Sequence, residues 1–355
     1  MSRFLSSKYQ SLEPYVPGEQ PKITRLIKLN TNESPWPPAP GIAEAVRKEA
    51  ENLNLYSDPE CTELRRALAE HFGLKPEELL ITNGSDEILN FAFMAFCDSS
   101  HPAAFADITY GFYSVFAKLY QVPVRIIPLR EDFTLAPEDY RNLAGPAFIA
   151  NPNAPTGLAL ELGKIREILE ANQDQVIVID EAYVDFGGES CIPLIREYGN
   201  LLVTRTFSKS RSLAGLRLGF GAAQESLIRD LKAMQYSTNP YNVDRLAQTA
   251  GVACMAEDAY NQKMVREVIR TRETTADALR SMGFSVTDSR ANFLFARHPD
   301  LPGDTLYRAL RERGILIRHF DQKRIRDWNR ITVGGPEQMK RLTDSVREIL
   351  EARKA

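Results

Sequence analysis

The sequence predicts an α/β fold, with a large domain built on a mostly parallel sheet and a small α+β domain at the C-terminus. Three observations lead to this prediction. The chain has 355 residues, more than one hydrophobic core usually supports. From about residue 40 to 240, apolar runs rich in β-branched residues alternate with helical patterns, which is typical of parallel strands buried on both faces. From residue 292 onward, a second and smaller set of strands and helices follows.

The first element is an extended arm, expected over residues 1–40, which we expect to join the small domain. Proline fixes its own φ and disfavours helix in the residue before it. The arm carries seven prolines: Pro14, Pro17, Pro21, Pro35, Pro37, Pro38 and Pro40.

The large domain is expected over residues 41–250. A helix is predicted over 61–72, where Leu64, Leu68 and Phe72 share one face and Gly73 follows as a stop signal. A strand at 79–82 precedes an apolar helix over 88–97. Six further strands bring the sheet to seven; they are predicted at 103–106, 124–127, 147–150, 176–179, 201–204 and 218–222.

Residues 251–355 are expected to hold an interdomain helix and the small domain. The helical pattern over 243–283 is long enough to bridge two domains. The small domain is then built from strands at 292–296, 315–317 and 330–333, a helix that ends at Arg313, and a last helix from Pro336.

Composition excludes several classes of function. The formal net charge is −3, from 44 basic and 47 acidic residues, so no broad field favours nucleic acid or an anionic membrane. We find no export signal and no run of roughly 18–20 apolar residues that would span a membrane. The four cysteines lack CxxC spacing, so we expect a protein of the reducing cytoplasm. The four histidines lack metal-ligand spacing, so no metal site is expected.

The strongest local signal is the run Thr206-Phe207-Ser208-Lys209, followed by Arg217. The lysine lies at the carboxyl end of a predicted strand, where open α/β sheets hold ligands. Lysine can act as a nucleophile, and hydroxyls beside a guanidinium match the oxygens of a phosphate. Two interpretations remain open: a lysine nucleophile beside a dianion site, or a solvated loop lysine.

A second signal is Asp180, which ends a buried strand and is followed by Tyr183. A carboxylate in this place can be a metal ligand, a base, the partner of a buried cation, or purely structural. A pyridine ring needs such a fixed carboxylate to stay protonated, and only the protonated ring serves as an electron sink. Tyr183 could then donate a hydrogen bond to the phenolic oxygen of the ring.

A third signal is Gly84-Ser85-Asp86, which opens an apolar helix. Free backbone amides at a helix N-terminus bind phosphate, and glycine permits close approach. Ser85 or Asp86 can equally serve as a helix cap, and the two roles are compatible. Tyr110 could lay its ring on a cofactor, or it could pack as an ordinary loop tyrosine.

Together these segments resemble the fold-type I, pyridoxal-phosphate-dependent aminotransferases, nearly from end to end. The resemblance rests on the segments at 151–157 (Asn-Pro-Asn-Ala-Pro-Thr-Gly), 180–183, 208–209 and 217–219, in the family's order. Within that family, the histidinol-phosphate branch is the most similar. That similarity rests on the segments at 29–35, 56–59, 206–209, 239–242 and 330–334.

The resemblance implies pyridoxal 5'-phosphate as cofactor, carried by Lys209 as a Schiff base. Lys209 would then act as the general acid/base, Asp180 would hold the ring nitrogen, and Tyr183 the phenolic oxygen. Tyr56 would reach the cofactor phosphate of the partner subunit in a homodimer. Further cofactor contacts would come from Gly84, Ser85, Asp86, Tyr110, Asn153, Thr206, Ser208 and Arg217.

The resemblance also implies the substrates. The reaction would be transamination between L-histidinol phosphate and 2-oxoglutarate, giving imidazole-acetol phosphate and L-glutamate in histidine biosynthesis. Tyr15, Glu33, Arg318 and Arg330 match positions on the substrate side. A bidentate guanidinium such as that of Arg330 accepts a carboxylate or a phosphate, which would account for two different substrates.

One departure concerns the segment before Pro155. Most relatives have asparagine there, donating to the phenolic oxygen of the cofactor, whereas this chain has Ala154. Asn153 would compensate, or Tyr183 would hold that oxygen alone.

Three other functions stay open at this point. An aromatic-amino-acid aminotransferase and a threonine-phosphate decarboxylase would use the same scaffold and the same Lys209. A non-catalytic ligand-binding module, of the kind fused to some transcription regulators, is disfavoured because no basic DNA-binding helix is visible.

Overall fold

The structure is a computed structural model that describes residues 2–10, 12–15, 18–19 and 26–354. Pro17 and Pro21 of the expected arm lie outside the described residues. Elsewhere in the arm, Ser7–Tyr9 form the short 3-10 helix η1 and Ile27–Lys28 form strand β1.

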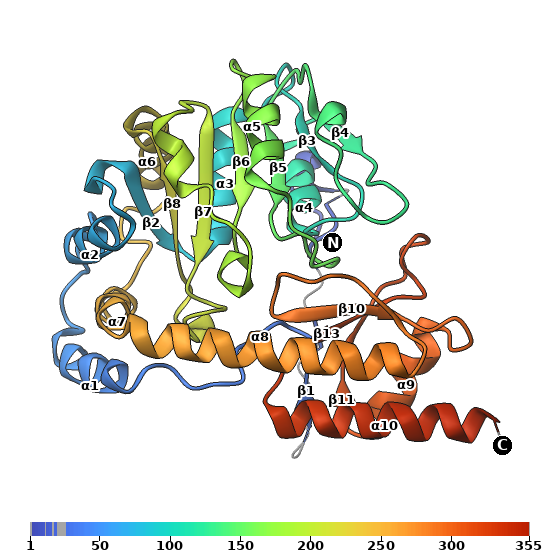
Figure 1. The fold of residues 1–355 in the computed structure, drawn as a ribbon. Helices are drawn as coiled ribbons and strands as arrows, with labels where there is room; N and C mark the ends of the chain where they lie inside the picture. The colour runs from blue at the N-terminus through green and yellow to red at the C-terminus, as the bar shows by residue number, and fades with distance from the viewer. Residues whose placement is uncertain (1, 11, 16–17, 20–25, 355) are drawn as a thin grey trace.

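The large sheet has seven strands in the order β2-β8-β7-β6-β5-β3-β4 (Figure 1). Neighbours from β7 to β4 are parallel, whereas β8 is antiparallel to β2 and to β7. This confirms the predicted α/β class with a mostly parallel sheet. The strands are β2 (Leu79–Asn83), β3 (Ala103–Ala106), β4 (Val124–Ile127), β5 (Ala147–Ala150), β6 (Ile177–Asp180), β7 (Leu201–Thr206) and β8 (Leu218–Ala223).

Helices cover both faces of this sheet, because alternate residues of each strand point to opposite sides. In β6, Ile177 and Ile179 join the core under α1, α2, α5 and α7, whereas Val178 joins the core under α3, α4 and α6. These helices are α1 (Pro40–Glu49), α2 (Thr62–Phe72), α3 (Ser85–Phe96), α4 (Phe112–Tyr120), α5 (Leu162–Glu170), α6 (Glu225–Thr238) and α7 (Arg245–Ala256). Burial on both faces explains why the strands read as unbroken apolar runs.

The small domain contains a four-stranded antiparallel sheet, β12-β13-β10-β9, and the two-stranded pair β1-β11. Its strands are β9 (Ser285–Val286), β10 (Phe293–Arg297), β11 (Ile315–Leu316), β12 (Arg318–His319) and β13 (Asn329–Thr332). Helices α9 (Gly303–Glu312) and α10 (Pro336–Lys354) pack on the same core. In β1, Ile27 pairs in parallel with Ile315, which supports the proposed place of the arm against the small domain.

The helical segment expected over 243–283 consists of two helices, α7 and α8 (Asp258–Ser281), which meet at Glu257. Helix α7 packs on α1 and α2. The expected boundary at residue 250 therefore falls inside a large-domain helix, and α8 alone runs from α7 into the small domain (Figure 1). Along the described chain, no helix is both long and apolar enough to cross a membrane.

Candidate active site

Most residues predicted for the site gather at one edge of the large sheet. Strands β2, β6 and β7 end at this edge, and the antiparallel β8 begins there. The loops that follow the strands, together with the arm and β13, surround a cavity of about 360 Å³. The predicted residues that line it are Tyr15, Glu33, Ser85, Asp86, Tyr110, Asp180, Tyr183, Thr206, Ser208, Lys209, Arg217 and Arg330.

Lys209 presents its amino group to this cavity. Its Nζ lies 3.4 Å from the carbonyl oxygen of Thr31 and 5.7 Å from the centre of the Tyr183 ring. Within the described part of the chain, Lys209 forms no ion pair. Its amine is therefore available to a reactive carbonyl rather than committed to a carboxylate.

Asp180 is a buried carboxylate with neutral hydrogen-bond partners. Tyr113 donates its hydroxyl to Oδ2 at 3.0 Å, and the backbone N–H of Ala182 donates to Oδ1 at 3.2 Å. Burial raises the pKa of Asp180 to about 7, although the hydrogen bond from Tyr113 acts in the opposite direction. A cation placed beside Oδ2 would be stabilised and would return this carboxyl to its ionised form.

A cradle for a dianion lies between β2 and β7. Gly84 has φ +75°, and a Cβ on it would lie 2.7 Å from Nη2 of Arg217, so only glycine fits there without displacement. Arg217 donates to Oγ of Ser208 at 3.3 Å, and Thr206 donates to the same oxygen at 3.0 Å. The backbone amides of Ser85 and Asp86 come before the first helical acceptor, whereas that of Glu87 already donates to the Gly84 carbonyl at 3.3 Å. Amides, hydroxyls and a guanidinium together match a phosphate group.

Tyr110 and Asp86 close the cavity above α3. The Tyr110 hydroxyl donates to Oδ1 of Asp86 at 2.8 Å, and Oδ2 of Asp86 accepts from Arg217 at 3.3 Å. The Tyr110 ring stands edge-on to Tyr113, with centroids 5.7 Å apart. Burial, with the Asp86 charge, raises the pKa of Tyr110 well above its ordinary value, so the phenol stays neutral. Tyr110 is thus held as a rigid aromatic wall.

Arg330, on β13, is a half-buried cation with a buried Nε and without a carboxylate partner among the described residues. Its Nη2 donates to the carbonyl oxygen of Asn30 at 3.0 Å, and its Nε has no hydrogen-bond partner. The guanidinium lies 5.4 Å from the ring centre of Phe293 and 5.9 Å from that of Phe320. Burial lowers its pKa. A buried unpaired charge is costly, so this side of the cavity is complementary to an anion.

Glu33 and Tyr15 belong to the arm. Glu33 accepts from Nζ of Lys28 at 2.6 Å and from the hydroxyl of Thr31 at 2.9 Å. Burial acts to raise the pKa of Glu33, but these donors outweigh it and the pKa is lowered. Tyr15 packs on Phe112, with ring centres 4.6 Å apart. The arm thereby contributes one fixed negative charge and one aromatic ring to the cavity.

Asn153 does not line the cavity, contrary to expectation. Its Nδ2 donates to the carbonyl of Ile108 at 3.0 Å and to the hydroxyl of Thr156 at 3.1 Å, and its Oδ1 accepts from Thr109 at 2.8 Å. These contacts engage the whole amide in holding the loop together. The neighbouring Ala154 lines the cavity in its place and offers only a methyl group.

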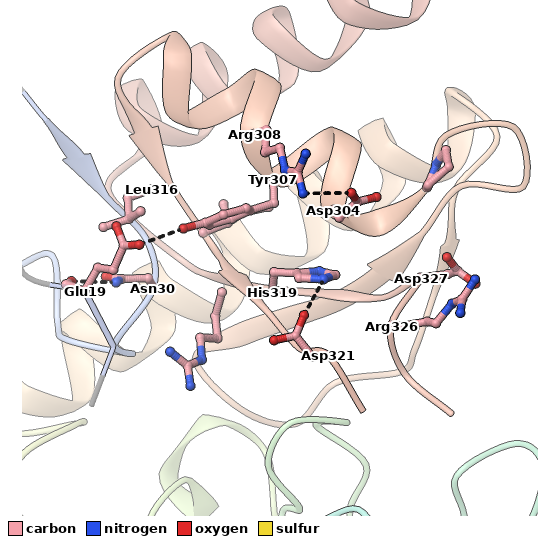
Figure 2. A pocket seen from close by; sticks show the side chains of 13 residues that line it. Glu19, Asn30, Asp304, Tyr307, Arg308, Leu316, His319, Asp321, Arg326 and Asp327 are labelled. Carbon is pink, nitrogen blue, oxygen red and sulfur yellow. Dashed lines mark hydrogen bonds and ion pairs between the residues drawn. The ribbon is translucent and has the colours of Figure 1, made fainter. Parts of the chain in front are cut away.

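Arg318 lies at the edge of a second cavity, of about 610 Å³, in the small domain. Figure 2 shows that the charged groups in this second cavity are turned toward one another: Tyr307 donates to Glu19 at 3.1 Å, and His319 approaches Asp321 at 3.7 Å. The side chains of Arg318, Arg326 and Asp327 form no hydrogen bond or ion pair with the described residues, and Oδ1 of Asn30 is buried without a partner there, so the polar groups of this larger cavity are paired only in part.

Arg318 nevertheless remains close to the substrate side. It pairs in register with Arg330 across β12 and β13, so the two side chains share one face of the small sheet. Their like charges interact, since Arg318 acts to lower the pKa of Arg330.

Tyr56 lies apart from the cavity of its own chain. It is 80% exposed and stacks on Tyr241, with ring centres 4.7 Å apart. Among the described residues, no group of three or more His, Cys, Asp or Glu side chains is arranged to hold a metal ion.

Two residues that contribute to the site were not predicted. Tyr113, in the first turn of α4, follows Tyr110 by three residues, and this spacing could have suggested two neighbouring aromatic rings at the start of the helix. Asn32 lines the cavity and donates to the Tyr183 hydroxyl at 2.9 Å. It lies in a segment that supported the resemblance, but no sequence pattern distinguished it from its neighbours.

Comparison with known proteins identifies the class. The profile of the family "Aminotransferase class I and II" matches residues 24–346. The chain belongs to this family. Histidinol-phosphate aminotransferase of Acetobacter pasteurianus is 48% identical over 351 residues, covering 99% of both chains. The enzyme of that name from Clostridium acetobutylicum is 44% identical over 99% of this chain and 100% of its own.

A solved structure shares the fold. Histidinol-phosphate aminotransferase from Sinorhizobium meliloti, crystallised in complex with pyridoxal-5'-phosphate, superposes with a TM-score of 0.88. The match is 23% identical and covers 99% of each chain.

Proposed function

We propose that this chain transfers the amino group of L-histidinol phosphate to 2-oxoglutarate, with pyridoxal 5'-phosphate as cofactor. The products are imidazole-acetol phosphate and L-glutamate, and the place of the reaction is histidine biosynthesis. The observation that carries the proposal is Arg330, a half-buried guanidinium whose buried Nε has no partner among the described residues, at the edge of the Lys209 cavity. The names of the full-length relatives at 42–48% identity point to the same substrate.

The residues of the cavity fit the cofactor at each of its polar positions. The cradle of Gly84, Ser208 and Arg217 suits its phosphate. The Asp180 carboxyl, with a pKa raised to about 7 and no cationic partner among the described residues, suits its ring nitrogen. The Tyr183 hydroxyl suits its phenolic oxygen, and the Lys209 amine its aldehyde.

When bound, pyridoxal phosphate supplies an aldehyde that exchanges amino groups and a protonated ring that accepts electrons. The protein supplies the rest. Lys209 removes the proton from the substrate Cα and returns it to C4′ of the cofactor, as general base and then acid. Asp180 keeps the ring nitrogen protonated, because an adjacent cation favours the carboxylate form. Tyr110 closes one side and limits movement of the ring.

Arg330 binds both substrates in turn. Its guanidinium is complementary to the phosphate of histidinol phosphate and to a carboxylate of 2-oxoglutarate, since both present two oxygens in a plane. Arg318 adds a second positive charge on the same sheet face. Tyr15 and Glu33 lie on the arm side, where an aromatic ring and a carboxylate suit a planar imidazole with N–H donors.

The active unit in this proposal is a homodimer in the cytoplasm. Leu53, Leu55 and Tyr56 form a run in which each side chain is more than half exposed, and Tyr241 stacks beside it. Exposed apolar residues grouped in this way mark interaction surfaces. Tyr56 then reaches the cofactor phosphate in the partner's cavity. The four cysteines are all free thiols, as expected in a reducing compartment.

Steady-state assays with 2-oxoglutarate test the proposal against its rivals. L-Histidinol phosphate, L-phenylalanine and L-threonine phosphate are compared as donors by kcat/KM, and carbon dioxide release is followed in parallel. A kcat/KM for histidinol phosphate at least about 100-fold above that for phenylalanine is expected, because the phosphate brings two negative charges to Arg330 and Arg318 where phenylalanine brings a single carboxylate, and a phenyl ring offers Glu33 no N–H. A preference for phenylalanine would assign an aromatic aminotransferase, and carbon dioxide from threonine phosphate would assign a decarboxylase.

A further inference from the structure

Asn32 is held in one orientation by contacts from the small domain. It is 1% exposed and has φ +57°, a left-handed conformation that asparagine tolerates better than most residues. The Thr332 hydroxyl accepts from the Asn32 backbone N–H at 2.9 Å and lies 3.0 Å from Asn32 Oδ1. Nδ2 of Asn292 donates to the Asn32 carbonyl at 2.9 Å. Backbone and side chain of Asn32 are therefore both fixed.

These contacts decide which way the amide points. The Thr332 hydroxyl accepts from the Asn32 backbone N–H and donates its single proton to Oδ1 of Asn32. The NH₂ group then faces Tyr183, whose hydroxyl oxygen lies 2.9 Å from Nδ2. An amide NH₂ can only donate, so the Tyr183 oxygen must accept from it. The proton of Tyr183 is thereby directed away from Asn32.

That proton has no protein acceptor in the described part of the chain, where the contact with Asn32 is the single hydrogen bond of the Tyr183 hydroxyl. The ring of Tyr183 is fixed edge-on against Phe293, with centroids 5.1 Å apart. Tyr183 lines the Lys209 cavity, so its hydroxyl is available as a donor to a ligand there.

The rest of the cavity wall offers no alternative amide. Among its described lining residues, Asn32 is the one with a side-chain amide. The Asn153 amide is engaged outside the cavity by Thr109, Ile108 and Thr156. Ala154 presents a methyl group.

We propose that Asn32 is a positioning residue that fixes Tyr183 as the hydrogen-bond donor to the phenolic oxygen of the cofactor. This role rests on the cofactor of the proposed function. Asn32 acts through Tyr183, and it compensates for the donor that Ala154 does not provide. Because Thr332, on β13 of the small domain, orients the Asn32 amide, the hydrogen bond donated by Tyr183 also depends on the position of the small domain.

The spectrum of the loaded protein reports this arrangement without any substrate. A hydroxyl that accepts a hydrogen bond becomes a stronger donor. A stronger donor on the phenolic oxygen stabilises its anionic form and lowers the pH at which the visible band of the bound cofactor changes. Loss of the hydrogen bond from Asn32 should therefore raise the midpoint pH of this spectral change.

The test is a pH titration of the visible absorbance of cofactor-loaded protein. Asn32→Ala is expected to raise the midpoint by roughly 0.7 of a pH unit, the shift for loss of one neutral hydrogen bond. Tyr183→Phe should raise it further, and the double variant should match Tyr183→Phe alone. Adding Ala154→Asn to Asn32→Ala should bring the midpoint back toward the wild type, because an amide donor is restored beside the same oxygen.

Asn32→Asp is the variant that keeps the shape and the left-handed backbone. Its carboxylate accepts and cannot donate, so the midpoint should rise at least as far as in Asn32→Ala. An unchanged midpoint in Asn32→Ala and Asn32→Asp would overturn this inference and leave the proposed function standing. The same would follow if Asn32→Ala shifted the midpoint by its full amount in a protein that already carries Tyr183→Phe. Absence of a visible band in the wild type would overturn the proposed cofactor, and this inference with it.

Discussion

Asp180 illustrates at the scale of one residue how a site is prepared for a cation. The carboxyl ends a strand that is buried along its whole length, and its two hydrogen-bond partners are neutral. Burial therefore prevails and raises its pKa to about 7. The folded, cofactor-free protein holds a proton near neutral pH that the unfolded chain, with an ordinary aspartate, has already released.

This shift predicts how stability depends on pH. The folded pKa lies above the unfolded value of 3.8, so the contribution of Asp180 to stability falls as pH rises from about 4 to about 7. Asp180→Asn should remove this fall, by as much as about 4 kcal/mol. Urea denaturation of the cofactor-free proteins at pH 5 and pH 8 measures the part of this fall that lies above pH 5, about 3 kcal/mol, with the exposed Asp174→Asn as control. Equal pH dependence in wild type and Asp180→Asn would show that the carboxyl is already paired.

Arg330 gives a second prediction at this scale. Arg330→Gln should lower kcat/KM for histidinol phosphate by about 100-fold or more, since the substrate phosphate loses a buried charged partner. Arg330→Lys should have a kcat/KM between those of the wild type and Arg330→Gln, because the lysine ammonium keeps the positive charge but loses the two-pronged geometry of the guanidinium. The exposed Arg297, on the neighbouring β10, is the matched control. The spectrum of the bound cofactor should stay unchanged, and a shift of its visible band in Arg330→Gln would place Arg330 in cofactor binding instead.

Single residues also show where sequence reasoning ends. Lys209, Asp180 and Arg217 could be singled out because each follows or precedes a recognisable buried strand. Asn153 could not be placed, because the partners that occupy its amide, Ile108 and Thr109, come from another loop. Asn32 could not be singled out either, since its role depends on Thr332, three hundred residues away.

At the scale of elements, the loop between β2 and α3 combines a backbone requirement with a binding role. Gly84 needs a positive φ and leaves room for Arg217. Gly73, the residue after α2, also has a positive φ of +64°, but a Cβ there would meet nothing within 4 Å. The two glycines share a positive φ but differ in ψ and in the contact: Gly73 has ψ 33°, in the left-handed helical region, whereas Gly84 has ψ 166°, a region that is essentially restricted to glycine.

Gly84→Ala and Gly73→Ala should therefore have separable effects. Gly73→Ala should lower stability by about 1 kcal/mol and Gly84→Ala by about 1–3 kcal/mol, because alanine is strained at both positions and more so at Gly84. Only Gly84→Ala should also weaken cofactor binding, by about tenfold or more, since the new methyl displaces Arg217 from the cradle. Cofactor titrations and urea denaturation of both variants measure this. Equal losses of affinity would show that strain, and not the approach of Arg217, is responsible.

Element prediction succeeded where burial was two-sided. The runs at 103–106 and 147–150 coincide with β3 and β5, because strands covered by helices are apolar throughout. The run at 124–127 coincides with β4, an exposed edge strand that its β-branched residues indicated. Strands β1, β9 and β12 have two residues each and were not predicted, since two residues carry no periodicity. The break between α7 and α8 was missed because no proline or glycine marks Glu257.

For the whole molecule, the proposal requires that two chains build each site. Lys209 comes from one protomer and Tyr56 from its partner. Tyr56→Ala and Lys209→Ala should each be impaired as homodimers. When equal amounts of the two variants are unfolded and refolded together, half of the dimers should contain one chain of each variant. Each such dimer carries one intact site out of two, so about one quarter of wild-type activity should return. No recovery, although mixed dimers are present by mass spectrometry, would show that Tyr56 serves its own chain or none.

The measurement that tests the central claim most directly is a half-reaction, followed by the visible absorbance of loaded protein without oxo acid. L-Histidinol phosphate should convert the bound cofactor to its aminated form, and 2-oxoglutarate should reverse the change. L-Phenylalanine should achieve the same only at far higher concentration, and Lys209→Ala should not respond on the same timescale. Equal or better conversion by phenylalanine would contradict the substrate assignment, and full conversion by Lys209→Ala would contradict the mechanism.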